Sequence, residues 1–275
     1  MYSIDDLDAD LALLAQSGAR VFTIGYSFLG RPIKCAVKGD LGGGQIFMQA
    51  AIHAREWATA PLAVRMLQAY SGSVGVWCVP MSNPDGIMLA QYGLDSVSDA
   101  AQRDFLLQVN GGSYDFSMWK ANARAVDLNV NFNAKWGTGA QNVTYPAPSD
   151  YIGAYPRSEP ETKALCDFTE RIQPSVTLSY HAKGNVIYRG FECINPYPQL
   201  ADEISLSTGY PAYSSAGSSG GYKDWYVTTA YKSGLTIEVG DSQWSYPQIQ
   251  DNLDIVYDAN RQVLDICARF VQDNM

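Results

Sequence analysis

The chemistry that this sequence could perform is concentrated in its two histidines and in two glutamates. His53 is followed three positions later by Glu56, whereas His181 and Glu238 stand much further along the chain. Imidazole nitrogens and carboxylate oxygens are zinc ligands, and carboxylates also serve as general bases. Taken singly, each residue also has a plainer interpretation: a helix-capping or core histidine, a surface glutamate, or a carboxylate in a buried ion pair.

The segments that carry these residues are predicted to be buried strands. "GQIFMQAAI" (44–52) leads to His53, "PSVTLSYHA" (174–182) ends around His181, and "SGLTIEVG" (233–240) carries Glu238. Short apolar runs next to glycine, proline or serine are typical of strands buried within a sheet. Sites of open α/β sheets lie beyond the strand ends, so these side chains are expected to converge there.

The remaining segments predict a mixed α/β fold. Leu7, Leu11 and Leu14 form the apolar stripe of a first helix, which Ser3 and Asp6 would cap. Further helices are predicted at 57–70, 158–171 and 253–271, further strands at 20–27, 31–39 and 73–81, and a turn at 82–86. The stretch 109–155 is predicted to form long functional loops. We expect a single domain over residues 1–275, with helices on both faces of a largely buried sheet.

Composition excludes several classes of partner. Hydrophobic residues make up 47% of the 275 residues and charged residues 17%, which is enough apolar material for a sizeable core. The formal net charge of −9 argues against binding to nucleic acid or to an anionic membrane surface. No apolar run approaches the roughly 20 residues of a membrane span.

The cysteines and the N-terminal residues predict a cytoplasmic protein. The five cysteines are widely spaced and form no CxxC pair, so free thiols in apolar surroundings are expected rather than disulfides or a cysteine-based zinc site. The first residues, "MYSIDDLDADLALLAQ", are acidic and amphipathic, unlike a signal peptide.

Four motifs in order along the chain resemble the zinc carboxypeptidases of the carboxypeptidase A type. They are "HAREW", "WKANARAVDLNVNF", "SYHAKG" and "TIEVG", and the resemblance extends from "YSIDDLDADL" to the last predicted helix. It implies a mixed eight-stranded sheet between helices and one Zn²⁺ per chain.

The resemblance also implies a role for each matching residue. His53, Glu56 and His181 would bind zinc, as in the His₂Glu site that carboxypeptidase A exemplifies. Glu238 would be the general base, and Arg124 of "WKANAR" would stabilise the oxyanion, with a surface ion pair to Asp127 as its alternative. The resemblance further implies that Asn129 binds substrate and that Arg55 flanks the substrate backbone, although Arg55 could also be a solvated charge.

Val130 departs from the family pattern. The family motif continues as D-x-N-R-N, in which the arginine binds the C-terminal carboxylate of the substrate, but this chain reads "DLNVNF". A branch that resembles bacterial γ-D-glutamyl-L-diamino-acid endopeptidases also lacks this arginine, and "SGGYKDW" (219–225) is similar to that branch. The expected substrates are therefore peptidoglycan-derived peptides, cut between γ-D-glutamate and diaminopimelate.

The Gly/Ser-rich stretch 212–225 is predicted to be a loop over the site. Tyr213 and Tyr222 are both candidates for the loop tyrosine that closes on the substrate in this family. Lys223 lies near the family position that lines the side-chain pocket, where a cation would suit an acidic substrate. Asp224 could contact an amine or only pair with Lys223.

Two other functions remain open on the sequence alone. One is a carboxypeptidase with its carboxylate clamp relocated to another cation, and the other is an inactive peptide-binding module. The complete set of His53, Glu56, His181, Arg124 and Glu238 argues against the inactive module.

Overall fold

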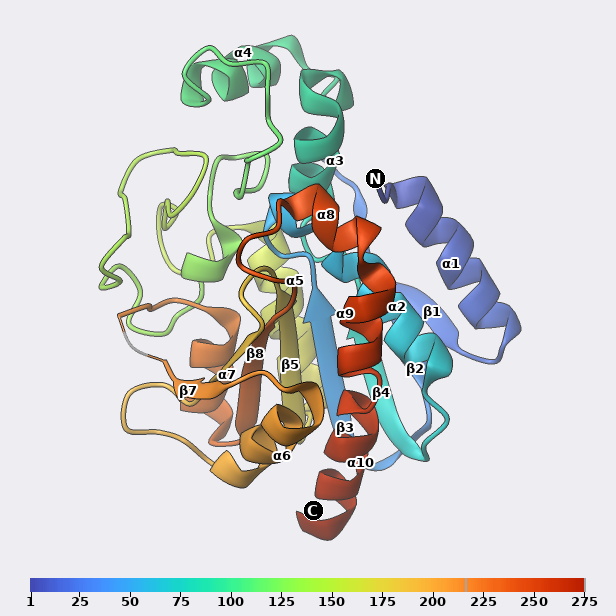
Figure 1. Cartoon of the computed structure of the whole chain (residues 1–275). Coiled ribbons are helices and arrows are strands. Elements are labelled where there is room, and N and C mark those ends of the chain that lie inside the picture. The colour runs from blue at the N-terminus through green and yellow to red at the C-terminus, as the bar shows by residue number, and fades with distance from the viewer. Residues whose placement is uncertain (216, 275) are drawn as a thin grey trace.

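A mixed sheet lies at the centre of the protein, as Figure 1 shows. The structure is a computed structural model that describes residues 1–215 and 217–274. Within that part, eight strands follow the order β1-β2-β4-β3-β5-β8-β6-β7. The strands are β1 (Arg20–Tyr26), β2 (Pro32–Lys38), β3 (Asp40–Ala50), β4 (Val74–Val79), β5 (Val176–His181), β6 (Val186–Arg189), β7 (Ala212–Ser214) and β8 (Ser233–Glu238).

The strands at the centre of the sheet run parallel to one another. β3 pairs with β4 and with β5, and β5 pairs with β8, all in parallel register. The outer strands β1, β2 and β6 join antiparallel neighbours. The carboxyl ends of β3, β5 and β8 therefore meet at one edge of the sheet, where sites of such folds lie.

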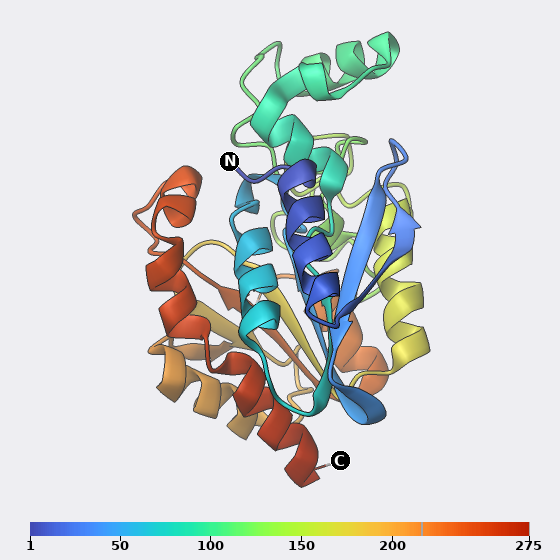
Figure 2. The same cartoon turned by 90° about the vertical axis from the view of Figure 1, so that its right-hand side faces the viewer.

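Helices cover both faces of the sheet, as the side view shows (Figure 2). One face carries α1 (Ile4–Gln16), α2 (Thr59–Ala69), α6 (Pro198–Thr208), α9 (Leu253–Asn260) and α10 (Val263–Asn274). The other face carries α5 (Pro160–Ile172) and α7 (Tyr222–Ala230). Above the sheet lie η1 (Ala54–Glu56), α3 (Pro84–Tyr92), η2 (Gly93–Ser96), α4 (Ala100–Val109), η3 (Leu128–Val130) and α8 (Tyr246–Asp251).

Both faces of strand β3 are covered near its carboxyl end, which explains the apolar run at residues 46–48. Ile46 and Met48 pack into the core cluster on the first face, whereas Phe47 packs into the cluster on the second. All three side chains are fully buried, because successive strand residues point to opposite faces and both faces are covered. Each such side chain contributes about 1.5–3 kcal/mol through burial.

The predicted fold class is confirmed, and so is the capping box of the first helix. Ser3 caps α1, with Asp6 accepting from the backbone N–H of Ser3 at 2.8 Å. Several details differ from the sequence-based prediction. Residues 82–86 begin α3, the 158–171 helix is capped at Glu159, and the last helix is divided between α9 and α10. The stretch 212–225, predicted as a loop, begins with β7 and ends on α7, and its residue 216 lies outside the described residues. The helices α4, α6, α7 and α8 and the short strands β6 and β7 were not predicted.

Asn83 explains the first of these differences. Its side-chain oxygen accepts from the backbone N–H of Gly86 at 3.0 Å, and Pro84 occupies the first turn. Both features start a helix as readily as they form a turn.

The cysteines differ from expectation at one position. Cys35, Cys78, Cys166 and Cys267 are buried free thiols, as expected, but Cys193 is exposed. It lies in the loop after β6, which the sequence pattern did not define.

Membrane-spanning helices are absent from the described residues. No helix there combines the length and the apolar character that crossing a bilayer requires.

Candidate metal centre and active site

Three neighbouring strands bring the chemically active side chains to one edge of the sheet. His53 follows β3 and opens the short helix η1, which carries Glu56. His181 is the last residue of β5, and Glu238 is the last residue of β8. The convergence expected from the apolar runs is therefore present in the fold.

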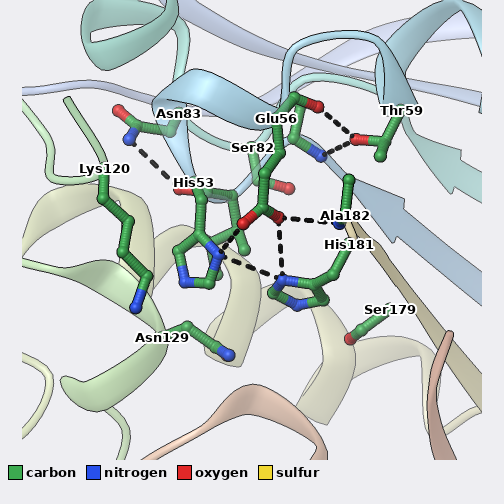
Figure 3. A network of polar contacts seen from close by, with 12 residues as sticks. His53, Glu56, Thr59, Ser82, Asn83, Lys120, Asn129, Ser179, His181 and Ala182 are labelled. Atoms are coloured by element: carbon green, nitrogen blue, oxygen red, sulfur yellow. Dashed lines mark hydrogen bonds and ion pairs between the residues drawn. The ribbon is translucent and has the colours of Figure 1, made fainter. Parts of the chain in front are cut away.

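His53, Glu56 and His181 form a tight, buried cluster, which Figure 3 shows from close by. The carboxylate of Glu56 lies 2.8 Å from Nδ1 of His53 through Oε1 and 3.2 Å from Nδ1 of His181 through Oε2. The two Nδ1 atoms are 3.2 Å apart. Each of the three residues is at most 6% exposed.

This geometry fits a zinc ion. Ligand atoms about 2.0–2.2 Å from a tetrahedral zinc ion are about 3.3–3.6 Å apart, close to the 3.2 Å between the two imidazole nitrogens. The donor set of two imidazoles and one carboxylate is also the set that zinc prefers in catalytic sites. The three residues are thus able to hold a zinc ion and leave one side of it open.

Asp127 supports the cluster from behind. Its Oδ1 lies 3.3 Å from Nε2 of His53, and its Oδ2 lies 2.8 Å from Nζ of Lys120. Burial raises the pKa of Asp127, but the charges of Lys120 and His53 outweigh burial and hold it well below its usual range. A carboxylate on the outer nitrogen of a metal-binding histidine fixes the ring and its tautomer.

The charges within the cluster reinforce one another. Burial lowers the pKa of His53, but the charges of Glu56 and Asp127 raise it to about 9. Burial likewise acts to raise the pKa of Glu56, yet the two histidines hold it well below the usual carboxyl range. The site is therefore adapted to keep the Glu56 carboxylate ionised against a cation.

Glu238 lies beside the cluster, and its pKa is shifted in the opposite direction to that of Glu56. Burial, followed by the negative charge of Glu56, raises the pKa of Glu238 to about 8. Its carboxylate still lines the cavity described next. A divalent cation held by the cluster would act in the opposite direction and favour the ionised form of Glu238.

A cavity of about 520 Å³ opens beside the cluster. It is a size that holds a small peptide fragment. Its lining includes charged, amide, aromatic and apolar side chains: His53, Lys120, Asn129, Val130, Tyr188, Lys223, Asp224 and Glu238.

Lys223 forms a buried ion pair inside this cavity rather than a solvated pair on a loop. Its Nζ donates to Oδ1 of Asp224 and to the carbonyl of Gly190, each at 2.5 Å. Lys223 is 5% exposed and Asp224 is 3% exposed. Burial lowers the pKa of Lys223, and the charge of Asp224 opposes that effect.

Asn129 and Val130 line the cavity, but Arg124 does not. The guanidinium of Arg124 lies 3.7 Å from Glu159 and 5.2 Å from the ring centre of Phe28, and its side chain is 47% exposed. Arg124 therefore lies outside the lining of the cavity beside the metal cluster.

A second cation on the cavity wall, besides Lys223, is Lys120, which the sequence analysis missed. It belongs to the same "WKANAR" motif, four residues before Arg124, so the signal was present. Its ammonium also lies 3.1 Å from Asp150. Burial acts to lower the pKa of Lys120, but Asp127 raises it above its usual value, so the side chain stays charged.

The loop tyrosines occupy unequal positions. Tyr222 is fully buried, and its hydroxyl lies 2.8 Å from Oγ1 of Thr169 in the core. Closure of Tyr222 onto a substrate is incompatible with that position. Tyr213 is 55% exposed on β7, and Tyr188, opposite it on β6, lines the cavity. Tyr188 carried no sequence signal, because the four-residue strand β6 was not predicted.

A comparison of the whole sequence with known protein families supports the resemblance carried by the four motifs. The family described as zinc carboxypeptidase matches residues 9–263. The chain belongs to the zinc carboxypeptidase family. Zinc is the cofactor of that family, and among the described residues the His-Glu-His cluster is a group that could hold it.

Individual relatives agree with this assignment. The chain is 36% identical over 238 residues to a γ-D-glutamyl-L-diamino acid endopeptidase 1 of Lysinibacillus sphaericus, which covers 79% of this chain and 59% of that protein. It is 30% identical to the uncharacterised protein YqgT of Bacillus subtilis, covering 82% of this chain and 65% of that protein. The chain thus spans about six tenths of the length of these curated relatives.

A solved structure shows the same fold. Bovine thrombin-activatable fibrinolysis inhibitor, in complex with tick carboxypeptidase inhibitor, superimposes with a TM-score of 0.80 at 20% identity, over 100% of this chain and 99% of that one. The eight-stranded zinc carboxypeptidase fold expected from the motifs is thereby confirmed.

Proposed function

We propose that this chain is a zinc peptidase that hydrolyses the bond between γ-D-glutamate and an L-diamino acid such as diaminopimelate. The observation that carries this proposal is the similarity to the Lysinibacillus sphaericus endopeptidase over 79% of the chain. Val130 on the cavity wall supports it, because an apolar side chain there cannot clamp the C-terminal carboxylate of an ordinary peptide.

In this proposal His53, Glu56 and His181 hold the zinc ion. Bound zinc supplies a Lewis acid that polarises the scissile carbonyl and makes water more acidic. The distances within the cluster and the burial of its three residues support this assignment.

Glu238 and Lys120 perform the remaining steps in this scheme. The Glu238 carboxylate accepts a proton from the water that attacks the carbonyl carbon, and it returns that proton to the leaving amine nitrogen as the C–N bond breaks. The Lys120 ammonium stabilises the negative charge that develops on the carbonyl oxygen. Asp127 positions both His53 and Lys120 through its two oxygens.

The leaving diamino acid occupies the cavity in this account. Lysine has three N–H donors, and two of those of Lys223 are engaged by Gly190 and Asp224. The third is available for a carboxylate of the substrate, and Asp224 is adjacent for its ammonium group. Asn129 also faces the cavity. Its side-chain oxygen accepts a hydrogen bond from the backbone N–H of Tyr222, whereas its amide nitrogen makes no hydrogen bond to the described residues and is available to the substrate.

A carboxypeptidase with a relocated clamp is the second candidate. Lys223 favours it, since a buried ammonium in the cavity could bind a C-terminal carboxylate in place of the missing arginine. The chain is also 27% identical over 191 residues to mouse carboxypeptidase A2.

Mass spectrometry of the products of a defined muropeptide separates the two candidates. The zinc-loaded protein is expected to release a fragment that begins with the diamino acid, leaving γ-D-glutamate at the end of the other fragment. Stepwise loss of single C-terminal residues would instead assign the carboxypeptidase function. A chelated sample serves as the control for contaminating peptidases.

A further inference from the structure

Arg55 is a cation next to the metal cluster with no hydrogen-bond or ion-pair partner among the described residues. It lies between His53 and Glu56 in the chain, on the short helix η1. Its Nε is buried without a hydrogen-bond partner, and the side chain forms no ion pair in the described part of the chain. Its guanidinium stacks over the ring of Tyr246, 5.1 Å from the ring centre. An arginine held against an aromatic ring with its donors unused is prepared to bind an anion.

Lys183 is a second cation over the ring of Tyr246, but its ammonium group already donates hydrogen bonds to the protein backbone. Nζ of Lys183 lies 5.8 Å from the ring centre of Tyr246, but it donates to the carbonyl of Ser242 at 2.8 Å and to that of Trp244. Lys183 thereby holds the segment before α8 in place. Arg55 is left as the cation on this flank with unused donors.

This flank is distinct from the cavity and still adjacent to the catalytic groups. Arg55, Lys183 and Tyr246 do not line the cavity that contains Lys223. Tyr246 nevertheless feels the negative charges of Glu56 and Glu238, which add to the effect of burial in raising the pKa of its hydroxyl. Of the cationic groups near the metal cluster, Lys223 therefore lies in the cavity and Arg55 lies outside it.

A peptide whose scissile carbonyl sits at the cluster must extend in both directions from it. If the leaving amine half fills the cavity, the acyl half lies on the Arg55 flank. In a γ-linked glutamate the acyl half carries a free α-carboxylate, separated from the scissile carbonyl by two methylene groups and the α-carbon. An α-linked peptide presents a carboxylate at that distance only when the residue before the scissile bond is a glutamate.

We propose that Arg55 binds the free α-carboxylate of the γ-D-glutamyl residue and so selects substrates whose acyl residue carries that carboxylate over substrates whose acyl residue is uncharged. This inference rests on the proposed function. The planar guanidinium matches a carboxylate through two parallel hydrogen bonds, and Tyr246 holds it in place for that contact. The chain would thus recognise both sides of the scissile bond by charge, with Arg55 on the acyl side and Lys223 on the amine side.

The test compares two substrates that differ in one group. Both are γ-D-glutamyl-diaminopimelate peptides, one with the free α-carboxylate and the other with an α-carboxamide of nearly equal shape. Arg55→Met is expected to lower kcat/KM for the carboxylate substrate about 10- to 100-fold. This loss is at the lower end of the range for removing one partner of a charge pair, because Arg55 is partly exposed. Its kcat/KM for the carboxamide should stay within about threefold, a difference of under 1 kcal/mol.

Arg65→Met is the matched control. Arg65 also stacks over a tyrosine, 4.0 Å from the ring centre of Tyr257, but it pairs with Asp254 on α9, outside the metal cluster. This variant should keep the wild-type preference for the carboxylate. Arg55→Lys should recover part of the preference, since it restores the charge without the planar fork.

Binding measurements separate recognition from damage to the metal site. In a Glu238→Gln background, calorimetry should show that Arg55→Met weakens binding of the carboxylate peptide and leaves binding of the carboxamide unchanged. Zinc content and unfolding temperature are measured on every variant. Equal losses on both substrates, or no loss on either, would overturn the role of Arg55 while leaving the proposed function standing. A wild-type protein that cuts neither γ-linked substrate would overturn both.

Discussion

His181 and Glu238 are direct register partners across the parallel strands β5 and β8. The backbone N–H of Val239, next to Glu238, donates to the carbonyl of His181 at 2.9 Å. A candidate metal ligand and the candidate base are therefore held at a fixed separation by the backbone of the sheet. The backbone N–H of Ala182 also donates to Oε2 of Glu56 at 3.1 Å, which ties the second strand end to the cluster. Sites held by strands and helices are positioned more precisely than sites held by loops.

Glu238→Gln is expected to retain the fold and the zinc ion while losing most turnover. The amide cannot accept the proton of the attacking water, and removal of a general base costs on the order of 10²–10⁴-fold in kcat. Steady-state kinetics on a γ-linked substrate, with zinc content measured in parallel, provides the test. A variant within threefold of the wild-type rate would place the base elsewhere.

Glu56→Gln is expected to lose zinc, whereas Glu192→Gln should bind it as the wild type does. Glu56 faces both imidazoles, while Glu192 is an exposed carboxylate that pairs with Lys135. Elemental analysis after dialysis against trace zinc reports the metal directly. Chelation should also lower the unfolding temperature of the wild type, because a ligand bound only to the folded state stabilises it. Undiminished zinc in Glu56→Gln would refute the proposed ligand set.

Lys120→Met should lower kcat about 10²–10³-fold, and Arg124→Met should change it by less than about threefold. Lys120 lines the cavity, but Arg124 lies against Phe28 and Glu159. Because Lys120→Met leaves Asp127 without its partner, Lys120→Arg is the control that keeps the charge and should recover most of the rate. If Arg124→Met produced the larger loss with zinc content intact, the original sequence-based role of Arg124 would be restored.

Glu161 is expected to make the folded state less stable as pH rises from about 4.5 to 7. Burial, with smaller contributions from the charges of Asp85 and Glu159, raises its pKa from 4.5 to about 7. In this window the folded protein holds a proton that the unfolded chain has lost, so the free energy of unfolding falls with increasing pH. The full effect of this shift is about 3 kcal/mol.

Glu161→Gln should remove that part of the pH dependence, whatever it does to the absolute stability. Urea unfolding between pH 4.5 and 8 measures the slope. Glu170→Gln, which changes an exposed carboxylate on the same helix, should leave the slope as in the wild type. Identical slopes for wild type and Glu161→Gln would contradict the raised pKa.

Residues at the ends of apolar strands were predictable from the sequence. The runs before His53, His181 and Glu238 are buried on both faces, so the pattern located both the strands and the edge at which they end. The short strand β6 was not predictable, since its few residues show no clear alternation, and Tyr188 was missed with it.

The choice between Lys120 and Arg124 required the three-dimensional structure. Asn122 accepts from the backbone N–H groups of Arg124 and Val126, and Ala125 takes a left-handed conformation with φ of 58°. This tight turn directs Arg124 away from the cavity, and motif spacing alone does not reveal it. Tyr222 was misplaced for a similar reason, because Gly221 caps α7 and turns Tyr222 into the core.

The most direct test of the central claim is the ratio of kcat/KM for two substrates of the zinc-loaded protein. One is a γ-D-glutamyl-diaminopimelate peptide, and the other is an ordinary α-linked peptide that ends in an apolar residue. Without an arginine at Val130, loss of the carboxylate clamp is expected to cost about 2–5 kcal/mol, or roughly 30- to several-thousand-fold in affinity. We predict efficient cleavage of the γ-linked bond and a rate at least about 10²-fold lower on the α-linked peptide. Efficient trimming of the α-linked peptide, with the γ-linked bond left intact, would contradict the account.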